Sequence, residues 1–178
     1  MTATRLLPLL LASLVLAACA GTPPREDAGA TFVVVRHAEK ASDSERDPEL
    51  SAAGQARARQ LAKRLAGDGI VAAYTTDYRR TRQTVAPAAD ARRVEPVVYD
   101  AQQSAEAFAA QLKAAHPRGA VLVAGHSNTV PGIVAALCGC RVEPMPETEY
   151  DRLSTVHIAP DGRARLEVAR YGAPAHAP

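Results

Sequence analysis

Apolar runs alternate along this chain with stretches in which apolar residues recur every three or four positions. The runs at 31–35 and 120–125 contain no charged residue. Such uninterrupted, β-branched runs are typical of strands buried on both faces of a parallel sheet. Residues 51–66 place apolar side chains at the i, i+3, i+4 and i+7 spacing of an amphipathic helix, with Ser51 as its N-cap.

The rest of the chain continues the alternation of strands and helices. Because strands alternate with helices, the pattern predicts an α/β fold: a three-layer sandwich with a mostly parallel central sheet, closed by a hairpin. The further predicted elements are strands at 70–75 and 94–99, helices at 79–91 (despite Pro87), 105–112 and 130–137, and hairpin strands at 155–159 and 164–169.

The N-terminus has the layout of a secretory signal peptide. Met1 to Ala18 carries one positive charge, at Arg5, before an apolar stretch too short to span a bilayer comfortably. It ends in Leu16-Ala17-Ala18-Cys19, which resembles the lipobox of bacterial lipoproteins. We therefore expect a signal peptide at 1–18, a lipid on Cys19 and a lipidated, flexible tether at 19–30. An ordinary signal peptide that happens to carry a cysteine is the alternative.

Ala20 after the cysteine, rather than Asp, resembles lipoproteins sent to the outer membrane. The expected location is thus the cell envelope, facing the periplasm, with the lipid as the membrane contact. We expect one folded domain at 31–171 and a disordered tail at 172–178. The formal net charge of +2 and the absence of Trp do not indicate a nucleic-acid-binding protein. No feature of the sequence indicates an oligomeric state.

Two histidines follow two of the predicted strands directly. Arg36 and His37 come after the first run, and His126 comes after the run at 120–125. Ligands of open parallel sheets bind beyond the carboxyl ends of the strands, so these side chains should face one crevice, which Arg80 can also reach. Guanidinium groups match phosphate oxygens and favour neutral, nucleophilic imidazoles. The set predicts attack on phosphorus and a phosphohistidine intermediate.

Cys138 and Cys140 allow two interpretations. They could pair in an oxidising envelope, but the Cys-x-Cys ring is tight and Gly139 would have to absorb the strain. We expect instead two small residues that close a helix. No cysteine or histidine pair has zinc-ligand spacing, so we predict no metal and no cofactor.

Four motifs, in a shared order, resemble those of the histidine phosphatase superfamily in its phosphoglycerate mutase-like branch. The resemblance implies a phosphoglycerate mutase-like fold over roughly residues 31–139. The motifs are Arg36-His37-Ala38-Glu39, Leu50-Ser51-Ala52-Ala53-Gly54, Arg80-Thr81-Arg82-Gln83-Thr84-Val85 and Gly125-His126-Ser127-Asn128.

The resemblance also implies roles for individual residues. His37 would be the nucleophile, Arg36 and Arg80 the phosphate clamp, and His126 a second, charge-stabilising partner. Ala38 stands where the family usually has Gly, a small change that still lets the backbone approach a phosphate.

The remaining expected roles concern the leaving group and the loop around it. Asn128 could hydrogen-bond the leaving group. The family usually supplies its proton donor from a Glu or Asp after the third strand, a position occupied here by Asp100. Glu39 lies close enough to contact substrate, although orienting the loop is its expected task. Whether Glu147, Glu149 and Tyr150 face the crevice cannot be decided from the sequence.

These features predict a metal-independent phosphoric monoester hydrolase of the histidine acid phosphatase type, located in the cell envelope. Its substrate would be a phosphorylated small molecule or a phosphoprotein. A non-catalytic, phospholigand-binding lipoprotein of the same fold is the alternative. A phosphoglycerate mutase fits neither the export signal nor the short segments after each strand. Because long insertions are absent, we expect an open crevice with shallow selectivity.

Overall fold

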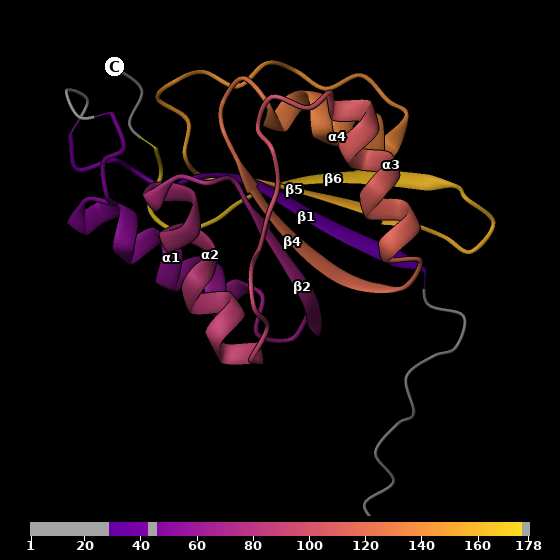
Figure 1. The fold of residues 1–178 in the computed structure, drawn as a ribbon, viewed down its shortest axis with the longest axis horizontal. Coiled ribbons are helices and arrows are strands. Elements are labelled where there is room, and N and C mark those ends of the chain that lie inside the picture. The colour runs from indigo at the N-terminus through magenta and orange to yellow at the C-terminus, as the bar shows by residue number, and fades with distance from the viewer. Residues whose placement is uncertain (1–28, 43–45, 176–178) are drawn as a thin grey trace, which may run out of the picture.

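A computed structural model describes residues 29–42 and 46–175, which form one sheet with helices on both faces (Figure 1). The strand order is β3-β2-β4-β1-β5-β6. Neighbours among the first four are parallel, and β5 and β6 add antiparallel pairs. The strands are β1 (Ala30–Arg36), β2 (Ile70–Thr75), β3 (Val97–Val98), β4 (Gly119–Gly125), β5 (Arg152–Ile158) and β6 (Ala164–Arg170).

Two helices cover each face of the sheet, which confirms the predicted three-layer sandwich (Figure 1). Alternate residues of β1 enter opposite halves of the core, because side chains alternate across a strand. Phe32 and Val34 pack toward α3 (Ala105–Ala115) and α4 (Val130–Cys138). Val33 and Val35 pack toward α1 (Ala52–Arg64) and α2 (Arg79–Arg92).

The predicted elements and the structure differ mainly at the sheet edge. The Ser51 side chain accepts a hydrogen bond from Gly54 N at 3.1 Å, so this N-cap is confirmed. Helix α2 runs through Pro87. The predicted strand at 94–99 is too long, since only Val97 and Val98 pair with β2. Pro96, which precedes them, has no N–H to donate to a ladder.

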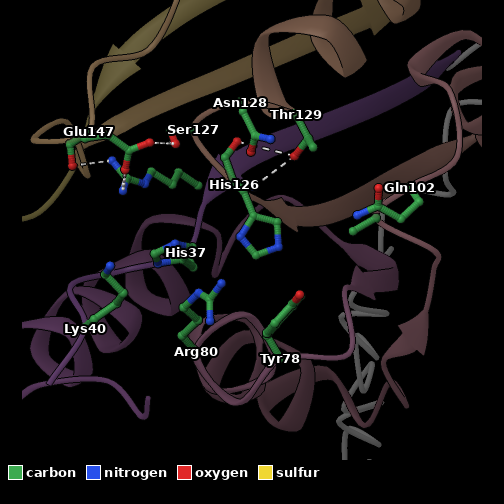
Figure 2. A pocket seen from close by; sticks show the side chains of 12 residues that line it. His37, Lys40, Tyr78, Arg80, Gln102, His126, Ser127, Asn128, Thr129 and Glu147 are labelled. Atoms are coloured by element: carbon green, nitrogen blue, oxygen red, sulfur yellow. Dashed lines mark hydrogen bonds and ion pairs between the residues drawn. The ribbon is translucent and has the colours of Figure 1, made fainter. Parts of the chain in front are cut away.

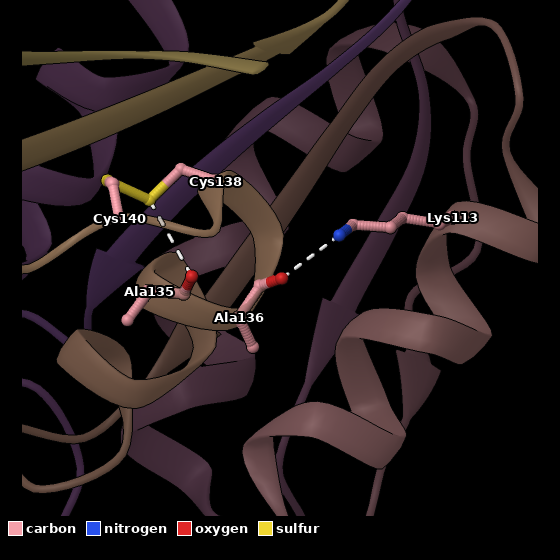
Figure 3. The surroundings of a disulfide bond; sticks show 5 residues. All are labelled: Lys113, Ala135, Ala136, Cys138 and Cys140. Carbon is pink, nitrogen blue, oxygen red and sulfur yellow. Dashed lines mark hydrogen bonds between the residues drawn. A yellow bond between two sulfur atoms is a disulfide. The ribbon is translucent and has the colours of Figure 1, made fainter. Parts of the chain in front are cut away.

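Cys138 and Cys140 form a disulfide, so the expectation of two unpaired cysteines was wrong (Figure 3). The helix does end where predicted, at Cys138. Gly139 then takes the left-handed conformation, with φ of 62°. This turn brings the two Cα atoms to 5.2 Å, within the range that a disulfide spans.

The predicted signal peptide, Cys19 and nearly all of the tether lie outside the described residues, as does the tail from 176 onward. Ala175 N, near the end of the described chain, donates a hydrogen bond to Asp151 Oδ2 at 3.2 Å. Over residues 29–42 and 46–175, no helix combines the length and apolar character needed to cross a bilayer.

Candidate active site

A cavity of about 270 Å³ opens where β1, β2 and β4 end (Figure 2). The first residues after β1 and β4 are His37 and His126, and both line it, as expected from the sequence. Basic side chains dominate its wall, and Glu147 is the one acidic side chain among its lining residues. The lining residues are Arg36, His37, Lys40, Tyr78, Arg80, Ala101, Gln102, His126, Ser127, Asn128, Thr129 and Glu147.

Arg36 is the last residue of β1, and its side chain is 2% exposed. Its Nη1 donates to the carbonyl oxygens of Pro146 and Glu147, at 3.1 and 2.6 Å, and more weakly to that of Glu149 at 3.3 Å. The guanidinium carbon also lies 4.2 Å from the ring centroid of Tyr150. Arg36 is therefore held in one orientation by the segment that precedes β5.

His37 presents one ring nitrogen to the protein and leaves the other available. Its Nδ1 lies 2.8 Å from the carbonyl oxygen of Ala38, which can only accept, so Nδ1 carries the proton. The Nε2 lone pair is then free to act as a nucleophile. Burial, followed by the charge of Arg36, lowers the His37 pKa to about 3, although the hydrogen bond to Ala38 opposes the shift. The imidazole is neutral at physiological pH.

The loop that carries His37 is tied to α2 through a threonine. Ala38 N donates to Thr84 Oγ1 at 2.9 Å, and that hydroxyl donates to the carbonyl oxygen of Arg80 at 2.7 Å. Thr84 is fully buried. It therefore fixes the start of α2, which bears Arg80, against the backbone next to the nucleophile.

His126 faces His37 with 5.4 Å between the ring centroids. Its Nε2 lies 3.0 Å from Thr76 Oγ1, and its backbone N donates to Thr129 Oγ1 at 3.0 Å. Burial is the main reason that its pKa falls to about 4, with Arg80 the next cause. The cavity thus holds two neutral imidazoles side by side.

Arg80 completes the basic wall from the first turn of α2. Its guanidinium carbon lies 4.3 Å from the ring centroid of Tyr78, and its Nη1 is 3.7 Å from Asp47 Oδ1. The Nε atoms of Arg80 and Arg36 are both buried, and neither has a hydrogen-bond partner among the described residues. Both arginines line the cavity, and guanidinium groups bind oxyanions through charge-assisted hydrogen bonds, so this wall suits an oxyanion.

Glu147 is a site residue that the sequence left undecided. Its carboxylate accepts hydrogen bonds from Arg36 Nη2, at 2.6 Å, and from Ser127 Oγ (Figure 2). The bond from Ser127, then the charge of Arg36, lowers the Glu147 pKa against the opposing effect of desolvation. Glu147 therefore carries a negative charge beside the cavity and links the first histidine motif to the second.

The structure does not bring Asp100 or Glu39 to this cavity. The Asp100 carboxylate instead accepts a hydrogen bond from Gln102 N at 2.8 Å within an exposed turn. Its expected role as proton donor therefore lacks geometric support. Arg57 binds both oxygens of Glu39, with Nε at 3.0 Å from each, so Glu39 orients the loop rather than contacting substrate. Asn128 does line the cavity, as expected.

In this cavity, basic side chains are the groups that can bind the negative charge of a phosphoryl group. Within the described residues, no group of three or more His, Cys, Asp or Glu side chains could hold a metal ion. The negative charge of a phosphoryl group in this cavity would be stabilised by Arg36, Arg80 and the histidines.

A family model identifies the part of the chain that carries the first histidine. The model of the histidine phosphatase superfamily (branch 1) matches residues 32–103, a range that contains Arg36, His37 and Arg80. This match confirms the resemblance seen in the sequence. No curated protein matches the chain.

Several solved structures share the fold. The protein histidine phosphatase SixA, complexed with tungstate, is 21% identical with a TM-score of 0.65, covering 79% of this chain and 96% of its own. A mycobacterial glucosyl-3-phosphoglycerate phosphatase is 15% identical with a TM-score of 0.63, covering 80% and 99%. YhfR of Bacillus stearothermophilus is 17% identical with a TM-score of 0.60, covering 78% and 96%. At these identities the likeness establishes the fold alone.

Proposed function

We propose that this member of the histidine phosphatase superfamily is a metal-independent phosphatase that hydrolyses phosphomonoesters through a phosphohistidine on His37. The observation that carries the proposal is that Arg36 and Arg80 line the same cavity as His37, whose lowered pKa keeps its imidazole neutral. An oxyanion bound between the two guanidinium groups would present its phosphorus to this nucleophile.

Binding of the phosphoryl group follows from the donors that are already in place. Two phosphoryl oxygens accept hydrogen bonds from the guanidinium groups of Arg36 and Arg80, which line the cavity. Since Arg36 is held by backbone carbonyls and Tyr150, it does not need to reorganise when substrate arrives. The incoming negative charge raises the pKa of His126, which then donates a hydrogen bond to a phosphoryl oxygen.

The first chemical step transfers the phosphoryl group to the enzyme. The His37 Nε2 lone pair forms a bond to phosphorus while the bond from phosphorus to the leaving oxygen breaks, and that oxygen keeps the electron pair. Among the described carboxylates only Glu147 lines the cavity, and its lowered pKa keeps it ionised. The leaving oxygen therefore takes its proton from water, which favours esters whose leaving groups are stable anions.

The second step regenerates the nucleophile. A water oxygen attacks phosphorus, the bond between nitrogen and phosphorus breaks, and the electron pair returns to His37 Nε2. One proton of this water remains on the departing phosphate, and the other neutralises the hydroxide that formed when water protonated the leaving oxygen. The hydrogen bond from Nδ1 to the carbonyl of Ala38 holds the ring in the same orientation throughout both steps.

Turnover of phenyl phosphate by the purified chain tests this function. Phosphate release should persist after extensive chelation, because the residues proposed to bind the phosphoryl group need no metal. Loss of activity on chelation with recovery on adding a divalent ion would contradict the proposal. Binding of inorganic phosphate without any turnover would instead favour the phospholigand-binding alternative.

We also propose that the protein is a lipoprotein of the cell envelope, because Leu16-Ala17-Ala18-Cys19 resembles a lipobox. Lipid attachment at Cys19 would place the phosphatase on the membrane, facing the periplasm. Expressed in a bacterium fed radiolabelled palmitate, the full chain should incorporate label and Cys19→Ser should not. Equal labelling of both forms, or of neither, would remove the lipid anchor.

A further inference from the structure

A second cavity of about 200 Å³ lies beside the phosphate cavity and shares three wall residues with it. The shared residues are Ala101 from the turn after β3, and Asn128 and Thr129 from the turn before α4. Because both cavities touch these three residues, they lie next to each other. The two cavities therefore have the arrangement of adjoining subsites for one substrate.

Apolar surface predominates in the second cavity. Tyr99 and Phe108 form its aromatic wall, with their rings stacked at 4.0 Å between centroids and 14° between planes. Both residues are at least nine-tenths buried, as is Ile133 from α4. The Tyr99 hydroxyl donates to the carbonyl oxygen of Ala124, so it presents no unsatisfied polar atom.

Small residues keep this cavity open. Ala105 begins α3 and Gly132 lies in the first turn of α4, and both line the cavity. A Cβ atom at Gly132 would come within 3.3 Å of the Ala105 Cβ. The starts of the two helices therefore already pack closely here, and since both residues line the cavity, a much larger side chain at Ala105 would extend into it.

The cavity has the size of a single ring. A cavity of about 150 Å³ lined by apolar side chains is large enough to bind benzene. Asp100 and Gln103 are polar members of the lining, beside the aromatic wall. A compact apolar group can occupy the interior, whereas a second carboxylate close to Asp100 would be repelled.

We propose that the second cavity binds the leaving group of the substrate, and that the substrate class is phosphomonoesters of compact apolar phenols with a single ring, whose anions are stable leaving groups. This inference rests on the proposed function and adds selectivity to it. It also replaces the expectation, drawn from the absence of long insertions, that the crevice is open with shallow selectivity. Here selectivity comes from the turn after β3 and the starts of α3 and α4.

Non-hydrolysable phosphonates test the subsite without involving the chemical step. Inhibition constants are measured on the purified chain for methylphosphonate, phenylphosphonate and 1-naphthylphosphonate, at a pH where all are fully ionised. Burial of one ring should make phenylphosphonate bind about tenfold more tightly than methylphosphonate. The second ring of the naphthyl compound exceeds the space available, so it should gain nothing further.

Two matched variants locate the effect. Ala105→Leu narrows the second cavity and should weaken phenylphosphonate binding to the level of methylphosphonate, whose own inhibition constant should not change. Ala107→Leu adds the same side chain at an exposed position of the same helix and should keep the tenfold preference. The unchanged methylphosphonate constant also shows that each variant is folded.

Equal inhibition by phenylphosphonate and methylphosphonate in the unmodified chain would overturn the subsite, whatever the variants do. Persistence of the tenfold preference in Ala105→Leu would overturn it as well. In both cases continued hydrolysis of phenyl phosphate would leave the proposed phosphatase function standing. If no phosphonate binds and no ester is hydrolysed, the proposed function itself fails.

Discussion

The imidazole rings of His37 and His126 meet at an interplanar angle of 65°, each directly following a different parallel strand of the sheet. Charge repulsion with His126 is one of the causes that lower the pKa of His37, after burial and the neighbouring Arg36. The pair is therefore neutral until an anion enters. Neutral His37 can therefore attack phosphorus, and the imidazoles take up a proton only after an anion has entered the cavity.

The lowered histidine pKa values predict how stability depends on pH. Folded His37 and His126 have pKa values of about 3 and about 4, whereas unfolded histidine has 6.5, so the unfolded chain binds more protons between these values. The free energy of unfolding should therefore fall as the pH drops from about 6.5 toward 4. Denaturant titrations should show a shallower fall for His37→Ala. An equally steep fall would contradict the assigned pKa.

Glu147→Gln tests the negative charge beside the cavity. The amide can still accept from Ser127, while Arg36 keeps its backbone carbonyl acceptors. With the charge removed, inorganic phosphate should inhibit about 1.4- to fivefold more strongly, since charge interactions at exposed groups contribute about 0.2–1 kcal/mol. The gain should shrink in high salt. Weaker inhibition by phosphate would mean that Glu147 chiefly holds Arg36 in place.

Asp100→Asn tests whether a carboxyl group protonates the leaving oxygen. Asp100 lines the proposed leaving-group cavity but not the phosphate cavity, where the leaving oxygen lies, so the dependence of the hydrolysis rate on leaving-group pKa should have the same slope in the variant as in the unmodified chain. The measurement is the rate for a series of alkyl and substituted phenyl phosphates. A loss of about 10²- to 10⁴-fold confined to alkyl esters would restore Asp100 as the proton donor.

The disulfide should contribute modestly to stability and nothing to catalysis. A ring of three residues gives about 1.5 kcal/mol or less in the chain-entropy account, so Cys138→Ser with Cys140→Ser should lower the free energy of unfolding by that amount. The pair lies at the opposite end of α4 from the cavity, and hydrolysis should be unchanged. A reductant should destabilise the unmodified chain and leave the double variant unaffected.

The residues that could be predicted from the sequence are those that directly follow strands. The apolar runs before His37 and His126 identify buried parallel strands, and strand ends in such sheets converge, so both histidines could be assigned to one crevice. Arg80 follows β2 by a short turn and could be placed for the same reason. Hydrophobic periodicity is sufficient to place these three residues, because each of them lies at or near the end of a regular strand.

Residues on irregular segments could not be placed in this way. Glu147 reaches the cavity from the segment between α4 and β5, which has no periodicity that aims a side chain. Asp100 follows an edge strand of only two paired residues, and the turn after it directs the carboxylate to Gln102 N. The disulfide depends on the left-handed conformation of Gly139. Glycine adopts this conformation and others about equally readily, so the sequence alone does not predict it.

The central claim is a covalent phosphohistidine on His37, and trapping it is the most direct measurement. The purified chain is mixed with a ³²P-labelled aryl phosphate, quenched within milliseconds in base and mapped by peptide analysis. Label that is stable to base and labile to acid should appear on the peptide containing His37 and be absent from His37→Ala, which should also lose hydrolysis. Unchanged turnover in His37→Ala, or label on a different residue, would contradict the account.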